Sequence, residues 1–393
     1  MFTIKAGRAL LGASLSTALL MIILSTPVLA TNLLEIWPRI SVGEMLTDNL
    51  LQQTNSSSGG DAISVVALGG TATVDSRKRT FSLDYATDAQ VYARNSGFDE
   101  AFQDQYIGLR DNERLSEATT LSASDYFFNG KQMFAQSLIG SSAASPLLSQ
   151  ALAQNTFLTN SFNAQLNHQF SDRLSSWASV HQTFFSTSGG ETSESFQQGG
   201  ELGTYYKVNA RLSLGPDLQF NDFRFSNQPR SDSYQPSLAV KWSWSERLTT
   251  SGTVGPLITT SATETSVGVG YTLSSSYVGD RWLFQLFSGR TSSITAGNSG
   301  SAVYQYGGAG AAYKLSRRTE AYVNGSLNQF SQTSNNYYSI AYGGGINHEL
   351  TRSISVFGQF VRFQTDSNGV NGNASDTLMF GIKFAPLPWV WSF

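Results

Sequence analysis

Cysteine is missing from all 393 positions of the sequence. The chain therefore forms no disulfide, holds no metal through a thiolate and carries no lipid on an N-terminal cysteine. Charged side chains are also scarce, at 13% of residues. Beyond the first thirty residues, no apolar run approaches the roughly 20 residues that a membrane-spanning helix needs. These absences exclude a disulfide scaffold, a lipoprotein and a helical membrane protein.

The long stretch of apolar and small residues lies at the start of the sequence. Lys5 and Arg8 give it a positive end, and residues 28–30 (Val-Leu-Ala) fit a signal-peptidase site. We expect residues 1–30 to be a cleaved secretory signal and residues 31–393 to be the exported chain. A membrane anchor is the alternative, but proline and hydroxyl residues interrupt the stretch.

The charge balance is mildly acidic. Without Lys5 and Arg8 the chain carries 23 basic and 28 acidic side chains, a net charge of −5, which argues against a nucleic-acid partner. An exported, cysteine-free chain without a spanning helix is either a soluble β-rich periplasmic protein or a closed barrel in the outer membrane of a Gram-negative bacterium.

Alternating apolar and polar residues favour the barrel. Residues 81–94 show the pattern best, because Phe81, Leu83 and Tyr85 alternate with Ser82 and Asp84, and successive side chains of a strand point to opposite faces. The polar face holds mostly Ser, Asn, Gln, Gly and Thr, which suits a water-filled interior better than an outer surface. The same pattern recurs in residues 162–170, 238–244 and 377–384.

A basic residue beside a short polar turn recurs along the chain, mostly every 34–38 residues. Two strands of about ten residues, one short turn and one longer loop need roughly that length. The period therefore predicts a transmembrane antiparallel up-and-down β-barrel of about 18 strands, with the arginines marking the periplasmic turns. These arginines are Arg79, Arg114, Arg173, Arg211, Arg247, Arg281, Arg317 and Arg352.

One connection breaks this rhythm. The interval between Arg114 and Arg173 holds an insertion, residues 129–156, in which Ser145-Pro146 before an apolar run predicts a short helix. The insertion is either an external lid over the barrel or a loop that constricts the lumen. The residues that would form the constriction are Lys131, Gln132, Ser145, Gln150 and Gln154.

The end of the sequence has the pattern of a last barrel strand followed by a short tail. Leu378, Phe380, Ile382 and Phe384 alternate in a strand that closes on an aromatic residue. Because two prolines interrupt the residues after Phe384, we expect residues 385–393 to form a periplasmic tail with aromatic side chains at the membrane interface.

Polar and aromatic residues on the expected inner face are candidates for lining the lumen. Rings stack on sugars and amides bind hydroxyl groups, so a sugar path is one use of such a surface; a plain polar wall is the other. The candidates are Asp84, Asp88, Tyr92, Arg94, Trp177, His181, Tyr205, Lys207, Asp217 and Lys241. His168 falls on the lipid-facing phase, and only His181 has same-face hydroxyl neighbours, Ser179 and Thr183.

Signatures of catalysis are weak or missing. No phosphate loop, zinc cluster or GxSxG motif is present, so we predict no enzymatic function, no catalytic or metal-binding residues and no cofactor. A hydrolase built on a hydroxyl–imidazole pair at His181 is the alternative.

Two segments resemble a known family. "WPRISVGEMLTDNLLQQ" (Trp37–Gln53) and "FSLDYATDAQVYARNSGFDEAFQDQYIGLRDNERL" (Phe81–Leu115), with its Asp-x-Arg-Leu-like turn, are similar to outer-membrane β-barrel proteins associated with PEP-CTERM/exosortase and exopolysaccharide gene clusters. The resemblance implies an outer-membrane protein tied to export of polysaccharide or protein to the cell surface. It brings no catalytic residues.

Three functions are consistent with these observations. The first is a passage or scaffold in export of exopolysaccharide or other surface material; the second is a general diffusion porin; the third is a structural or adhesion barrel with a blocked lumen. The expected partners are outer-membrane lipids, the barrel-assembly machinery and polysaccharide or export-system components.

Overall fold

The computed structural model describes residues 33–48, 60–98, 100–130, 156–188, 194–226, 229–262, 264–294, 301–331, 336–367 and 374–392. The expected signal segment and residues 131–155 of the insertion, with its five constriction candidates, lie outside the described residues. The helix that the described part contains is one 3-10 turn, η1 (Ser96–Phe98). No helix in the part searched is long and apolar enough to cross a membrane.

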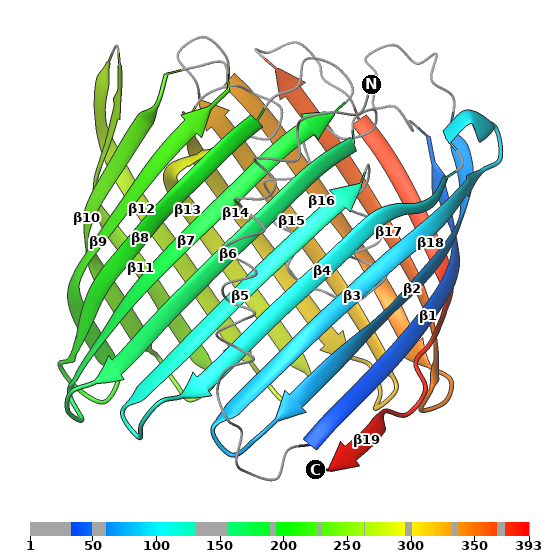
Figure 1. The fold of residues 1–393 in the computed structure, drawn as a ribbon, viewed down its shortest axis with the longest axis horizontal. Coiled ribbons are helices and arrows are strands. Elements are labelled where there is room, and N and C mark those ends of the chain that lie inside the picture. Colours follow the sequence, from blue (N-terminus) through cyan, green and yellow to red (C-terminus); the bar gives the residue numbers. More distant parts are fainter. Residues whose placement is uncertain are drawn as a thin grey trace.

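Eighteen antiparallel strands form a closed wall (Figure 1). Each strand pairs with its neighbours along the chain, and β18 closes the barrel on β1. The predicted fold and strand number are confirmed. The strands are β1 (Leu33–Thr47), β2 (Asp61–Asp75), β3 (Arg79–Tyr92), β4 (Glu100–Arg114), β5 (Thr119–Gly130), β6 (Thr156–Gln169), β7 (Leu174–Ser188), β8 (Glu194–Lys207), β9 (Leu212–Phe225), β10 (Ser231–Ser243), β11 (Leu248–Ser261), β12 (Thr265–Val278), β13 (Trp282–Ile294), β14 (Ser301–Lys314), β15 (Thr319–Ser331), β16 (Asn336–Glu349), β17 (Ile354–Ser367) and β18 (Ala374–Phe384).

The alternation places apolar side chains on one surface of this wall. Val42 of β1 pairs with Val66 of β2 and with Ile382 of β18, and all three are more than two-fifths exposed. Exposed apolar residues in register around a closed sheet give it the outer face that lipid requires. The opposite phase carries the polar residues and faces the lumen.

The short turns all lie at one end of the barrel, where the recurring arginines predicted them. Arg79 begins β3 beside such a turn, and its guanidinium makes two 2.8 Å hydrogen bonds to Asp111 of β4. At other turns, such as those at Arg173 and Arg247, the backbone carbonyl of the arginine accepts a cross-strand hydrogen bond. The arginines thus mark turn positions, as the spacing indicated.

The C-terminal tail adds a short strand to the wall. Pro386 and Pro388 precede β19 (Trp389–Ser392), which pairs antiparallel with the first four residues of β1. The side chains of Trp389 and Trp391 are about half exposed at the short-turn end. The prolines therefore end one ladder, and the chain starts another beyond them.

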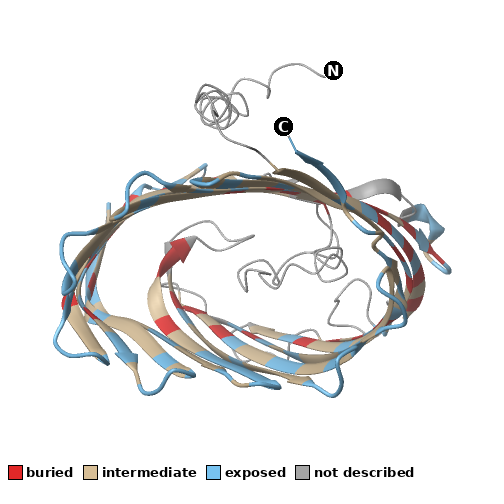
Figure 2. Ribbon diagram, turned by 90° about the horizontal axis from the view of Figure 1, so that it is seen from below, coloured by how far each residue is buried: buried red, intermediate tan, exposed pale blue. Residues whose placement is uncertain are grey.

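One part of the wall leaves the cylinder. β13 pairs with β12 only from Leu283 to Arg290, although both strands continue beyond these residues. Its last part coils into the barrel (Figure 2), and Ser292 donates a 2.5 Å hydrogen bond to Ser233 of β10. The alternation did not predict this departure.

Candidate functional site: the barrel lumen

An aromatic and acidic cluster lies on the inner face of β7–β9. The rings of Trp177 and Tyr205 are 4.6 Å apart between centroids, and Trp177 donates a 2.8 Å hydrogen bond from Nε1 to Glu201. Asp217 of β9, which is 6% exposed, pairs with Gly203, two residues from Glu201 on the same face. Trp177 lies over Gly203, where any side chain would collide with its ring. The cluster joins a stacking surface to a pair of carboxyl groups.

Two arginine side chains lie on the inner face of β1 and β4. Arg39 of β1 lies 3.7 Å from Asp84 of β3 and donates to Thr71. Arg110 of β4 donates to Tyr126 and stacks over its ring. Arg39 is thus paired with a carboxylate, and charges of both signs line this part of the inner face.

A buried polar chain orders the inner face of β3. Asp88 accepts hydrogen bonds from the backbone N–H of Asp104 and from Gln90, and Gln90 accepts one from the hydroxyl of Tyr92. All of these residues are buried. Since each partner is satisfied within the wall, Asp88 and Tyr92 stabilise it and are not free to hold a solute.

His181 belongs to an amide network. Its Nε2 lies 2.7 Å from Oδ1 of Asn221 on β9, which also accepts a hydrogen bond from Gln197. The described contacts of His181 place it with an amide and not with the hydroxyl groups of Ser179 or Thr183. A nucleophile–base pair is therefore not formed there.

Nine of the ten lumen candidates fall on the inward phase of their strands. Arg94 lies past the end of β3, at the rim, where it donates to the carbonyl of Gly60. Sequence reasoning missed Glu201 and Asn221. Their even spacing from the inward-facing neighbours Gly203 and Gln219 would have placed both on the same face.

No group of three His, Cys, Asp or Glu that could hold a metal ion occurs in the part of the chain that was searched. His168 and His348 lie outside the lumen, and each ring Nδ1 is 2.8 Å from the hydroxyl of the threonine that begins the neighbouring strand, Thr119 or Thr319. These two pairs repeat one arrangement at the short-turn end.

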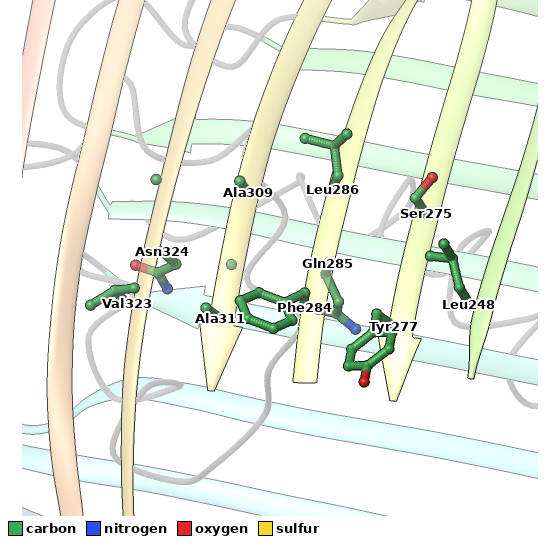
Figure 3. A pocket seen from close by; sticks show the side chains of 12 residues that line it. Leu248, Ser275, Tyr277, Phe284, Gln285, Leu286, Ala309, Ala311, Val323 and Asn324 are labelled. Atoms are coloured by element: carbon green, nitrogen blue, oxygen red, sulfur yellow. The ribbon is translucent and has the colours of Figure 1, made fainter. Parts of the chain in front are cut away.

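The outer face carries a shallow depression of about 560 Å³ over β11–β15 (Figure 3). Tyr277, Phe284 and Val323 surround it, and Ala309 and Ala311 form its floor. These residues lie on the lipid-facing phase of their strands. The hollow therefore lies on the apolar outer face and not in the lumen.

The fold defines a class: a β-barrel built to span a bilayer. No protein-family model matches the chain, and no curated protein matches it. Solved structures with a similar fold include Pseudomonas aeruginosa OccK2 (OpdF), at 9% identity and TM-score 0.46 over 90% of this chain and 98% of that one. P. aeruginosa OpdQ is 13% identical, with TM-score 0.44 over 91% and 98%. A BenF-like porin from Pseudomonas fluorescens Pf-5 is 9% identical, with TM-score 0.47 over 90% and 99%.

Proposed function

We propose that the protein lies in the outer membrane of a Gram-negative bacterium and lets small hydrophilic solutes diffuse through its lumen. The observation that carries this function is the closed wall with an apolar outer face and a polar inner face. A polar inner face favours a water-filled lumen, because a packed core would need apolar side chains there. A barrel of about 16–18 strands is wide enough for an aqueous channel. The charged groups along the inner face would orient polar solutes on their way through.

Conductance of the purified protein in a planar lipid bilayer tests this function. We expect discrete ion-conducting steps, and we expect proteoliposomes to swell in solutions of small sugars and amino acids. A folded, heat-modifiable barrel that inserts but carries no current would overturn the diffusion function and favour the structural or adhesion barrel.

Passage of saccharides is a second candidate, and one observation favours it. The Trp177–Tyr205 pair beside Glu201 combines a stacking surface with hydrogen-bond acceptors, which is the chemistry that sugars need. The resemblance of the N-terminal segments to exopolysaccharide-associated barrels agrees with it. Export of a polymer stays a prediction.

Sugar-dependent blocking of the current distinguishes the two candidates. Oligosaccharides should interrupt the current of the natural protein, and Trp177→Ala should shorten each block while leaving the open current in place. Phe284→Ala, which removes a ring from the outer face, is the matched control. Equal blocking in Trp177→Ala and the natural protein would leave only non-selective diffusion.

A further inference from the structure

The gap between β12 and β13 leaves two strand edges without a ladder. β12 pairs with β11 up to Thr265, but its residues 265–270 have no partner on β13. β13 pairs with β14 up to Ile294, but its residues 291–294 have no partner on β12. In a bilayer an open edge of this kind is tolerated only where water or another molecule satisfies its backbone groups. We call this gap the seam.

Specific contacts hold the inner side of the seam in place. Ser292 is 3% exposed, and its hydroxyl donates to Ser233 on β10, two strands beyond β12. Ser233 in turn accepts a hydrogen bond from Asn221. Because Ser292 lies on the outward phase of β13 and Ser233 on the inward phase of β10, the tip of β13 rests against the inside of the wall. Specific side-chain contacts therefore stabilise the seam.

The two lips of the seam differ in polarity. On β12 the lip is apolar, with Val267 71% exposed and Val269 55% exposed. The other lip follows the outward phase of β13–β15, where Arg290, Gln305 and Gln329 lie in register. A molecule that satisfies both lips must itself be amphipathic.

Arg290 supplies the charge on the polar lip. It is half-buried behind β12, with its guanidinium about 3.4 Å from where a side chain on Gly268 would begin. Among the described residues no carboxylate forms an ion pair with it. The facing wall also holds Gln235, 3% exposed, whose Oε1 points toward Gly270 and accepts no hydrogen bond. An unpaired guanidinium suits an anionic head group, and the amide of Gln235 adds a polar neighbour.

We infer that the seam is a lateral binding site for a single-chain amphiphile with a carboxylic acid head, such as a fatty acid from the outer leaflet. The head binds Arg290 inside the seam, and the chain passes Val267 and Val269 into the bilayer. The six residues of β12 that have no partner on β13 span about 20 Å at roughly 3.3 Å each. This length accommodates one long acyl chain. One guanidinium matches one head group. This site connects the lumen with the membrane and is separate from the proposed solute path along the barrel axis.

Disulfide locks can hold the seam open or closed, since the natural chain has no cysteine. Ser233→Cys with Ser292→Cys locks the tip of β13 inside, because the two hydroxyl groups already touch. Continuing the observed register of Tyr271 opposite Arg290 would bring Val269 opposite Ser292, so Val269→Cys with Ser292→Cys locks the seam shut. Thr253→Cys with Thr272→Cys bridges β11 and β12 away from the seam, where the hydroxyl groups are 2.9 Å apart, and serves as the control.

The experiment uses the full barrel in liposomes that contain a photoreactive palmitic acid. We expect labelling of β12 and β13 in the natural protein, the open lock and the control. The closed lock should lower it about tenfold, and reduction of the disulfide should restore it. Unchanged labelling in the closed lock would overturn the site. If that disulfide does not form, substitution of Arg290 decides.

Arg290→Gln separates head-group binding from mere contact with lipid. It should weaken labelling by palmitic acid about tenfold, as the loss of one charge-assisted hydrogen bond predicts, and leave labelling by a photoreactive hexadecanol unchanged. Arg247→Gln, at a turn where the guanidinium pairs with Asp280, is the matched control. Equal loss of both probes, no loss of either, or equally strong labelling by a two-chain phosphatidylglycerol would overturn the inference. None of these readouts needs ion conduction. A barrel that carries no current but is labelled by palmitic acid would therefore overturn the proposed diffusion function and support the lateral binding site.

Discussion

Strands β1 and β13 differ in how completely they pair with the strand that precedes or follows them. β1 pairs with β2 at every position from Leu33 to Thr47, whereas β13 leaves β12 after Arg290. The outward phase of β1 is apolar at Ile40, Val42 and Leu46, and its polar member, Glu44, accepts a hydrogen bond from Ser64 on β2.

The outward phase of β13 starts apolar and then changes. Phe284 and Leu286 are followed by Ser288, Arg290 and Ser292. Polar side chains on a lipid-facing phase cost free energy at membrane depth, and inside the barrel Ser292 has a hydroxyl partner. The comparison teaches that a polar outward phase makes a place in the wall less favourable for a strand.

The largest expected effect comes from making β13 resemble β1. Replacing Arg290 and Ser292 by Val should return the tip of β13 to the wall, because its outward phase would then favour lipid. The conductance should rise severalfold as the lumen widens, measured on single barrels in a planar bilayer. The same replacement at Thr291 and Ser293, on the other phase, is the control and should not raise it. A current unchanged by the first pair would show that contacts other than the outward phase hold the tip inside.

An arginine on the outer face should lower the free energy of unfolding more at β1 than beside the seam. Val42→Arg puts a guanidinium on the lipid-facing side of a fully paired strand and should lower the free energy of unfolding by about 2–4 kcal/mol. Val267→Arg, beside the seam, should cost about 0–1 kcal/mol, because its head can reach the polar lip. Denaturant titration in lipid vesicles measures both. Equal losses would mean that the seam gives no access to polar surroundings.

Ion selectivity tests the acidic cluster on the inner face of β8 and β9. Glu201→Gln with Asp217→Asn removes two acidic groups from the inner face and should lower the preference for cations over anions by roughly twofold. The reversal potential in a salt gradient reports this ratio. Asp280→Asn, on an exposed turn, is the control. If it changes selectivity as much as the double variant, the carboxyl pair does not face the solute path.

The smallest effect is expected at His181. Its replacement by Ala removes one hydrogen bond to Asn221, whose Oδ1 still accepts one from Gln197. We expect a loss of about 1 kcal/mol in unfolding free energy and no change in conductance or cellular phenotype. Complete loss of phenotype with normal level and folding would revive the hydrolase alternative.

Much of the fold was predictable because its signals are local. Alternation fixes which face of residues 81–94 meets lipid, and the arginines at 79, 173 or 247 fall beside turns that only a few residues define. The site was less predictable. Asp217 and Trp177 could be placed on the inner face, but their positions next to Glu201 depend on the register of β8 between β7 and β9.

The pairing of the C-terminal tail was also not predictable from local sequence. Pro386 and Pro388 predict an end to β18, and the chain does leave that ladder there. The pairing of Trp389–Ser392 with the start of β1 joins the two ends of the described chain. No local pattern specifies it, since an exposed strand edge accepts any segment that reaches it in an extended form.

The sequence by itself determined the closed, lipid-facing barrel, because a period of two residues and a hairpin repeat leave few other ways to satisfy the backbone. Only the tertiary structure decided the path of β13. Ser288, Arg290 and Ser292 show that this strand is poorly suited to lipid, but whether it lies in the wall or inside it depends on a partner three strands away. That partner is Ser233 on β10, which the closed barrel alone brings within reach.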